Sequence, residues 1–181
     1  MREAQFSTDR AVESILFLAA RLKNPTVHEI LKLLYFADKA HLEKYGCMAL
    51  GDQYCAMEFG PVASQTYDLM KAARGIRNRW TCDDYVEAVK NAISITGHHV
   101  RALREPRLDY LSTSHLNCLE SAASEFSGLG FEQRTKISHD DAYERAWAAA
   151  AAMGSEQSPM SVPSIAKTLP NAGEVLSYIE S

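Results

Sequence analysis

The chain has 181 residues, of which 46% are hydrophobic and 23% are charged, a composition typical of one soluble domain. Its formal net charge of -4 and pI near 5.9 exclude a global basic field that would hold nucleic acid, although a local basic patch stays compatible with them. No segment approaches the roughly 20 consecutive apolar residues that span a bilayer, and no signal-peptide cleavage site follows the amphipathic start. We therefore predict a cytoplasmic protein that does not enter a membrane.

Two amphipathic helices are predicted at the start of the chain. Residues 8–22 carry apolar side chains at the 3.6-residue period. Thr26 and the glutamate three residues later form a capping box for a second helix over 27–45, which Gly46 ends. The first half of that helix is apolar nearly all round, with Lys32 as its charged residue after the first turn, so we predict that it is central and buried.

A third helix is predicted to begin at Gly60-Pro61, after a short extended run over 53–59, and to end at Gly75. Proline suits the first helical turn, because its φ is fixed and its missing N–H would have no intrahelical partner.

Further elements follow in the second half of the chain. A helix is predicted over 83–90, and alternating residues over 92–103 predict a small antiparallel hairpin. Either Ser112 or Ser114 can cap the next helix, and Ser138 is predicted to cap the last long one. The fold class is therefore mainly α (α+β): a compact helical domain around a central buried helix, with a small antiparallel β-hairpin or sheet.

The composition changes after Gly154, where three of the six prolines fall among serines without a sustained period. We predict one domain over residues 1–153 and, over 154–181, a Pro/Ser-rich C-terminal arm with a short terminal helix. The arm either packs on its own domain or waits for a partner.

Catalytic and metal-binding patterns are largely absent from the sequence. There is no nucleophile elbow, P-loop or Rossmann fingerprint, and His28 lacks the second histidine of a zinc-protease motif. An enzyme with an unrecognised site around His41, His139 and Asp38 is one alternative, but structural roles are favoured for both histidines. His28 and His115 lie in first helical turns, where we expect them to face solvent.

The four cysteines form no C-x-x-C pair and are predicted to be free, buried thiols. No cofactor or metal is predicted. The cysteines are Cys47, Cys55, Cys82 and Cys118.

Arginines cluster twice, at 74–79 and at 101–107. If the hairpin lies beside the end of the third helix, they form a positive patch able to meet an acidic protein or RNA, which makes a nucleic-acid-binding regulator a second alternative. The favoured interpretation is that they pair with local acids, and nucleic acid is not an expected partner. The six arginines are Arg74, Arg77, Arg79, Arg101, Arg104 and Arg107.

Four spaced blocks, "KLLYFADKAHLEKYG", "GDQYCAMEFGPVASQTYDLMK", "REPRLDYLSTSHL" and "SHDDAYERAW", together resemble the Panacea antitoxin-domain family, most closely its SocA-like branch. The likeness runs in order from about residue 31 to 147. The positions that carry it, mostly with structural roles, include Leu34, Tyr35, Ala37, Asp38, His41, Gly46, Gly60, Pro61, Val62, Tyr67, Ser138, His139 and Trp147.

The resemblance implies a largely helical antitoxin of a toxin-antitoxin system that is not an enzyme and binds a cognate protein toxin directly. SocA-like members are also linked to delivery of a toxin to the ClpXP protease. No helix-turn-helix accompanies the domain, although many relatives have one. Candidate toxin-binding residues are Tyr54, Glu58, Arg74, Arg77, Arg101, Arg104, Leu176 and Ile179.

Overall fold

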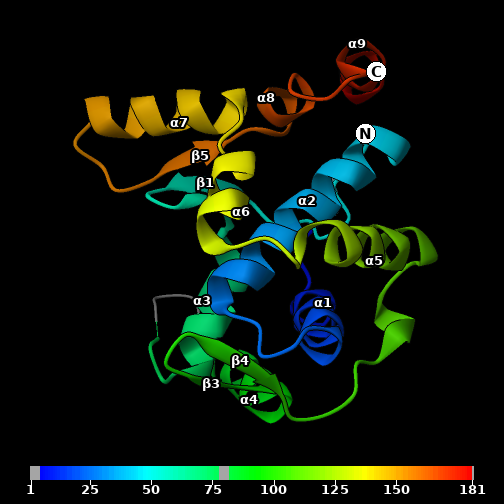
Figure 1. Cartoon of the computed structure of the whole chain (residues 1–181), viewed down its shortest axis with the longest axis vertical. Coiled ribbons are helices and arrows are strands. Elements are labelled where there is room, and N and C mark those ends of the chain that lie inside the picture. Colours follow the sequence, from blue (N-terminus) through cyan, green and yellow to red (C-terminus); the bar gives the residue numbers. More distant parts are fainter. Residues whose placement is uncertain (1–4, 78–81, 181) are drawn as a thin grey trace.

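The computed structural model describes residues 5–77 and 82–180, and its centre is one long helix, α2 (Val27–Tyr45). Figure 1 shows α2 passing through the middle of the molecule, and elements from the start, the middle and the end of the chain contact it. Two small antiparallel sheets complete an α+β fold that is mainly helical, which confirms the predicted fold class.

The predicted bounds of the central helix are confirmed. The Thr26 hydroxyl accepts a hydrogen bond from the Glu29 N–H at 3.1 Å, and Gly46 closes the helix with φ 72°. The preceding helix, α1 (Thr8–Arg21), is capped by Ser7 and packs against α2.

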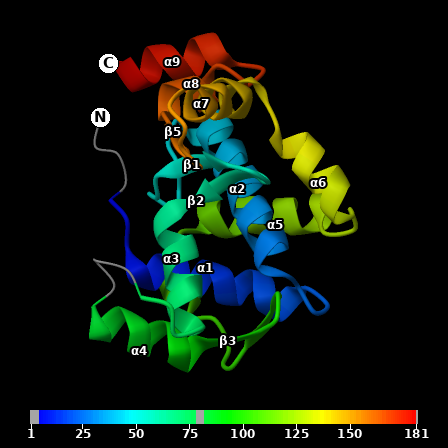
Figure 2. The same ribbon diagram turned by 90° about the vertical axis from the view of Figure 1, so that its left-hand side faces the viewer.

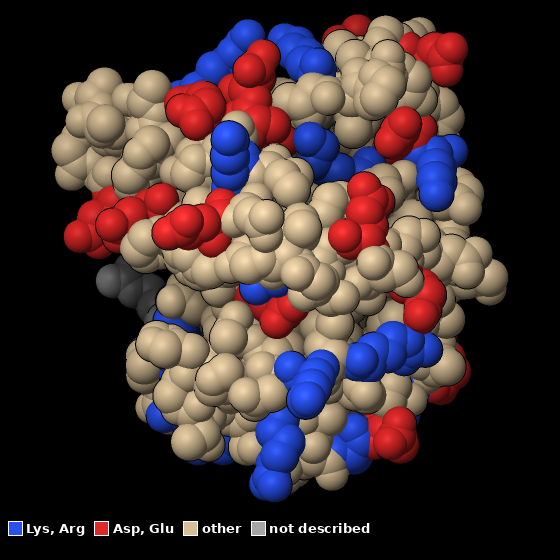
Figure 3. All heavy atoms as spheres, viewed as in Figure 1, with Lys and Arg blue, Asp and Glu red and all other residues tan. Residues whose placement is uncertain are grey.

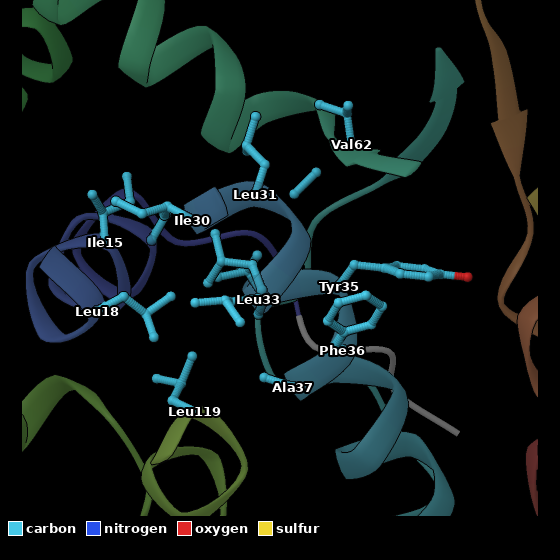
Figure 4. Packing of buried hydrophobic residues seen from close by; sticks show 14 of the residues in the cluster. Ile15, Leu18, Ile30, Leu31, Leu33, Tyr35, Phe36, Ala37, Val62 and Leu119 are labelled. Atoms are coloured by element: carbon cyan, nitrogen blue, oxygen red, sulfur yellow. The ribbon is translucent and has the colours of Figure 1, made fainter. Parts of the chain in front are cut away.

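The core is organised around α2 (Figure 4). Ile30 lies beside Ile15 of α1, whereas Leu31 on another face of the helix meets Val62, and Tyr35 points away from α1. All of these side chains are buried, so α2 is apolar nearly all round because other elements cover it on most sides.

A three-stranded sheet packs near α2 in the order β2-β1-β5, formed by β1 (Tyr54–Met57), β2 (Gly60–Ala63) and β5 (Ser158–Met160). The prediction that a helix begins at Gly60-Pro61 is therefore wrong. Pro61 sits opposite Ala56 in an edge strand, where its missing N–H is tolerated.

Helix α3 (Ser64–Ala73) begins directly after β2. Its N-terminus is not capped by the preceding residue but by Asp52, which lies before β1. The Asp52 carboxylate accepts hydrogen bonds from the Gln65 N–H at 3.0 Å and from the Thr66 N–H at 2.7 Å. This remote cap satisfies the first orphan N–H groups, so the start of α3 was not visible in a local sequence pattern.

The helix predicted over 83–90 and the hairpin predicted after it are confirmed. They are α4 (Asp83–Ala92) and the paired strands β3 (Ile93–Thr96) and β4 (His99–Ala102). A short 3-10 turn, η1 (Leu108–Tyr110), precedes α5 (Thr113–Phe126). Ser112 rather than Ser114 caps α5, since its hydroxyl accepts from the His115 N–H at 3.2 Å.

Two helices replace the single one predicted around Ser138. Ser138 is the last residue of α6 (Phe131–Ser138), and α7 (Asp141–Ala152) is capped by Asp140, which accepts from two backbone N–H groups. The predicted cap at Ser138 is therefore wrong: the Ser138 hydroxyl donates to the Thr135 carbonyl at 2.8 Å inside α6, and Asp140 caps α7 instead.

The C-terminal segment packs on its own domain instead of forming a detached arm (Figure 2). β5 pairs with β1, and the helices α8 (Val162–Ala166) and α9 (Ala172–Glu180) follow it onto α2. Its buried apolar residues are Met160, Ile165, Ala166, Leu169 and Val175.

Candidate interaction site

A cleft of about 350 Å³ opens between the first half of α2, the β1–β2 turn and the start of α6. Two aromatic side chains stand at it: Phe59 is 51% exposed and Phe131 is 47% exposed. Their ring centroids are 5.6 Å apart in an edge-on arrangement. Exposed apolar rings beside a cleft are typical of interaction surfaces.

Lys32 lies at the buried end of this cleft. Its side chain is 1% exposed, and its Nζ donates a hydrogen bond to the Pro61 carbonyl at 2.8 Å. No carboxylate among residues 5–77 and 82–180 pairs with it. Burial lowers the pKa of Lys32 to about 7, because the charged ammonium loses its water.

Gly60 makes room for this ammonium. Its φ of 101° strongly favours glycine, and an added Cβ would lie 2.6 Å from the Ser138 Oγ and 2.8 Å from the Lys32 Nζ. Three elements, α2, β2 and α6, therefore meet at the Gly60 backbone.

His28 joins the cleft to α6. Its Nε2 is 3.1 Å from the Thr135 Oγ1, and its ring centroid is 4.1 Å from that of Phe131. Burial and the charges of Lys32 and Arg134 lower the pKa of His28 to about 4, so the ring is neutral at pH 7. The expectation that His28 faces solvent is therefore only half right, since its side chain is partly buried.

Two of the candidate toxin-binding residues, Glu58 and Arg74, also line this cleft. Arg74 donates to the Gly97 carbonyl at 2.7 Å, which places the β3–β4 hairpin beside the end of α3, as the sequence analysis supposed. Sequence reasoning did not identify Lys32, Phe59 or Phe131 as site residues, because α2, the β1–β2 turn and α6 bring them together only in the folded chain.

Asp38, by contrast, is part of the core. Its carboxylate accepts hydrogen bonds from the Ala49 and Leu50 N–H groups and from the Tyr54 hydroxyl, at 2.8, 3.0 and 2.9 Å. Burial raises the pKa of Asp38 to about 6, against the opposing effect of these hydrogen bonds. Tyr54, a candidate toxin-binding residue, is 2% exposed, so its side chain belongs to the core in the free protein.

The histidines proposed for an unrecognised active site lie in separate environments. His41 places Nδ1 2.7 Å from the Cys47 carbonyl and Nε2 3.0 Å from the Ser114 Oγ, so both nitrogens have structural partners. His139 stacks on Tyr143 with ring centroids 4.0 Å apart. No hydrogen-bond, ion-pair or ring partner described for His41 is shared with His139.

His115 is 2% exposed, so the expectation that it faces solvent is wrong. Burial, followed by the nearby charges of His41 and Arg10, lowers the pKa of His115 to about 4. Unfolded histidine titrates near about 6.5, so protonation favours the unfolded chain, and the stability contributed by neutral His115 is lost as pH falls from about 6.5 to about 4.

Replacement of His115 by leucine should therefore flatten the acid side of the stability profile. We expect the wild-type protein to lose about 2 kcal/mol more than His115→Leu between about pH 7.5 and about pH 5. Asp38 acts in the opposite direction, because its raised pKa lets the folded state take up a proton first, but it does so in both proteins. Urea titrations at the two pH values measure the difference, and parallel profiles would contradict the role of His115.

The arginine clusters are largely used inside the molecule. Glu13, which is 0% exposed, binds both Arg104 and Arg107, at 2.6 and 3.0 Å. Burial would raise the pKa of Glu13, but the hydrogen bonds from Arg104 and Arg107 hold it below its usual value. Arg77 pairs with Asp83 at 2.5 Å. The favoured interpretation, pairing with local acids, therefore holds for these three arginines.

Arg101 is exposed and has no acidic partner within the described ranges, and Arg79 lies outside them. On the face shown in Figure 3, several basic side chains gather in the lower part of the view, whereas basic and acidic side chains alternate in the upper part. Acidic side chains also lie beside the lower group, so this face carries both signs of charge.

The remaining predicted positions divide by exposure. Leu176 and Ile179 on α9 pack partly against the core, as do Tyr67 and Trp147. Gly46 lies under the Tyr178 ring, whose nearest carbon would be 2.4 Å from an added Cβ. The buried family-motif residues are Leu34, Tyr35, Ala37, Asp38, His41, Gly46, Gly60, Pro61, Val62 and Ser138.

The cysteines are free, but only Cys55 and Cys118 are buried, while Cys82 is exposed. The prediction of buried thiols is therefore wrong for Cys82, which lies at the start of α4 with an open surface. Within the described residues, no group of three or more His, Cys, Asp or Glu is placed to hold a metal ion.

None of the helices in the described part of the chain is both long enough and apolar enough to cross a membrane.

A second cleft, of about 380 Å³, lies between Asp52 and Met160 and has a mostly apolar lining. Its charged lining residue, Asp52, is already bonded to Gln65 and Thr66.

Comparison with protein families gives one match. The model described as "Antitoxin SocA-like, Panacea domain" covers residues 30–148, which is 119 of the 181 residues. It spans the elements from most of α2 to most of α7, including Asp38 and most residues that line the cleft. Among curated proteins and solved structures, no significant match to the chain was found.

Proposed function

Because the chain belongs to the family of SocA-like antitoxins with a Panacea domain, we propose that it neutralises a cognate protein toxin by binding it directly. The single observation that supports this function most strongly is the family match over residues 30–148. We place the protein in the cytoplasm and assign it no catalytic activity.

The distribution of polar groups favours a binding protein. Asp38, His41 and Glu13 are occupied by structural hydrogen bonds or ion pairs, whereas exposed aromatic rings gather at the cleft. Binding sites commonly combine such apolar anchors with a few charges, while an enzyme needs polar groups that converge on one reacting atom.

The test is a growth assay in cells that express the toxin encoded beside this chain. Co-expression of the wild-type protein is expected to restore growth, and a stable complex is expected in size-exclusion chromatography. Growth that stays arrested although both proteins are produced would contradict the function.

Delivery of the toxin to ClpXP is a mechanistic variant of the same function. An inhibitor that acts by contact alone should protect cells lacking ClpX, whereas an adaptor should fail in them. Toxin half-life after a block of translation distinguishes the two routes.

An enzyme at His41 and His139 makes a different prediction. We expect the double variant His41→Ala, His139→Ala to neutralise the toxin fully wherever circular dichroism shows that it is folded. His41 donates and accepts structural hydrogen bonds, so a loss of stability of about 1–3 kcal/mol is expected. A folded double variant without neutralising activity would support the catalytic alternative.

A further inference from the structure

The cleft beside Phe59 and Phe131 contains a buried amino group, that of Lys32, without a buried anion beside it. In its ammonium form the group has three N–H donors, and the Lys32 Nζ uses one of them on the Pro61 carbonyl. Among the described residues no carboxylate or second acceptor bonds to it. Buried ionisable groups are normally paired, so a lysine that is 1% exposed and has no carboxylate partner calls for a specific explanation.

The charges around the cleft add to this imbalance. When Lys32 is protonated, Lys32 and Arg74 contribute two positive charges to the lining and Glu58 contributes one negative charge, which leaves one positive charge in excess. Arg74 bonds to a carbonyl oxygen and to no carboxylate in the described ranges.

The mouth of the same cleft is apolar. About half of each ring of Phe59 and Phe131 is in contact with water, although the two rings touch each other. Phe59 lies between β1 and β2, in a turn with Glu58, so it can change rotamer without disturbing the sheet. Such rotamer changes are common when interfaces form.

We propose that this cleft receives an acidic side chain of the protein partner, together with an adjoining apolar side chain that packs on Phe59 and Phe131. The carboxylate accepts the N–H groups that Lys32 leaves unused and supplies the missing negative charge. The apolar neighbour covers the two rings. This inference rests on the proposed function and names the chemistry of the bound segment.

Because Lys32 is 1% exposed in the free protein, side chains that line the cleft must move aside before a carboxylate reaches Nζ. The buried position is then an advantage, because a charge pair shielded from water is stronger than one at the surface. The cost falls on the free protein, which keeps an ammonium group away from water.

The variant Lys32→Met tests both the cost of burying Lys32 in the free protein and its contribution to binding, since methionine has a similar length and no charge. We expect Lys32→Met to raise the Tm by about 5 °C, because the desolvated charge is removed. The same variant should lose binding. The matched control is Lys44→Met, at an exposed position near the end of the same helix.

The probes are the capped dipeptides acetyl-Phe-Glu-amide and acetyl-Phe-Gln-amide, titrated into the full chain and followed by NMR shifts of the Phe59 and Phe131 amides. The acidic peptide should bind about tenfold more tightly than the neutral one, because hydrogen bonds to charged groups are the stronger ones. Lys32→Met should remove that difference, and Lys44→Met should keep it.

Three results would overturn the inference: no saturable shift with the acidic peptide, equal affinity for both peptides, or an unchanged preference in Lys32→Met. Saturable binding of 4-phenylbutyrate without binding of the acidic peptide would assign the cleft to a small acid and also overturn it.

The growth assay keeps this inference apart from the proposed function. A toxin that the wild-type protein does not neutralise contradicts the function and leaves the peptide preference as measured. A toxin that the wild-type protein and Lys32→Met neutralise equally well contradicts the inference alone.

Discussion

A chain that ends after residue 153 is expected not to fold. The cut removes β5 from the side of β1 together with α8 and α9. Four large apolar buried side chains leave the core with them: Met160, Ile165, Leu169 and Val175. Burial of each contributes about 1.5–3 kcal/mol, so roughly 6–12 kcal/mol is lost, comparable with the about 5–15 kcal/mol that stabilises a whole domain. Thermal unfolding by circular dichroism checks this.

A pair of single substitutions in β5 provides the control. Met160→Ala empties a buried position and is expected to cost about 2–5 kcal/mol, whereas Pro159→Ala changes an exposed neighbour and should cost less than about 0.5 kcal/mol. A shortened chain with a cooperative transition at the wild-type temperature would show that the C-terminal segment is dispensable for the fold.

Gly60→Ala should also be strongly destabilising, and it should perturb the cleft. The left-handed φ costs about 1–3 kcal/mol for alanine, and displacement of the Ser138 and Lys32 side chains adds about 1–3 kcal/mol. The matched control is Gly97→Ala, which also has positive φ but meets no atom within 4 Å. Its cost should be about 1–2 kcal/mol.

Urea unfolding of both glycine variants measures the difference. Equal free energies of unfolding for Gly60→Ala and Gly97→Ala would mean that Ser138 and Lys32 move aside at little cost. The close packing of three elements at Gly60 would then not contribute to stability.

Local patterns predicted the elements whose signals lie within a few residues. The Thr26 cap and the Gly46 terminator gave α2 its confirmed bounds, and the alternation on both sides of Gly97 gave the hairpin. Each of these depends on backbone preferences that neighbouring residues determine.

The errors arise where tertiary contacts override such preferences. Gly60-Pro61 has the chemistry of a helix start, but pairing with β1 makes it an edge strand, and Asp52 caps α3 from a distant loop. The C-terminal segment has few periodic residues, yet β5 completes the sheet because β1 has a free side.

The candidate site was harder to predict than the fold. Lys32 was noticed as the charged residue of an apolar helix, but its use depends on the Pro61 carbonyl and on the absence of a facing acid, which only the packing shows. Phe131 belongs to α6, a helix that the sequence analysis did not predict. The arginines were visible as clusters, but their pairing with Glu13 was not.

The central claim, neutralisation of a protein toxin by direct binding, is tested most directly by purifying the tagged full chain from its own host and identifying what elutes with it. We expect one protein to elute with the chain in a fixed ratio. That protein should arrest growth when it is expressed alone, and co-expression of this chain should restore growth. Recovery of the chain alone from cells that produce the toxin, or of a bound protein that is harmless when expressed alone, would contradict the claim.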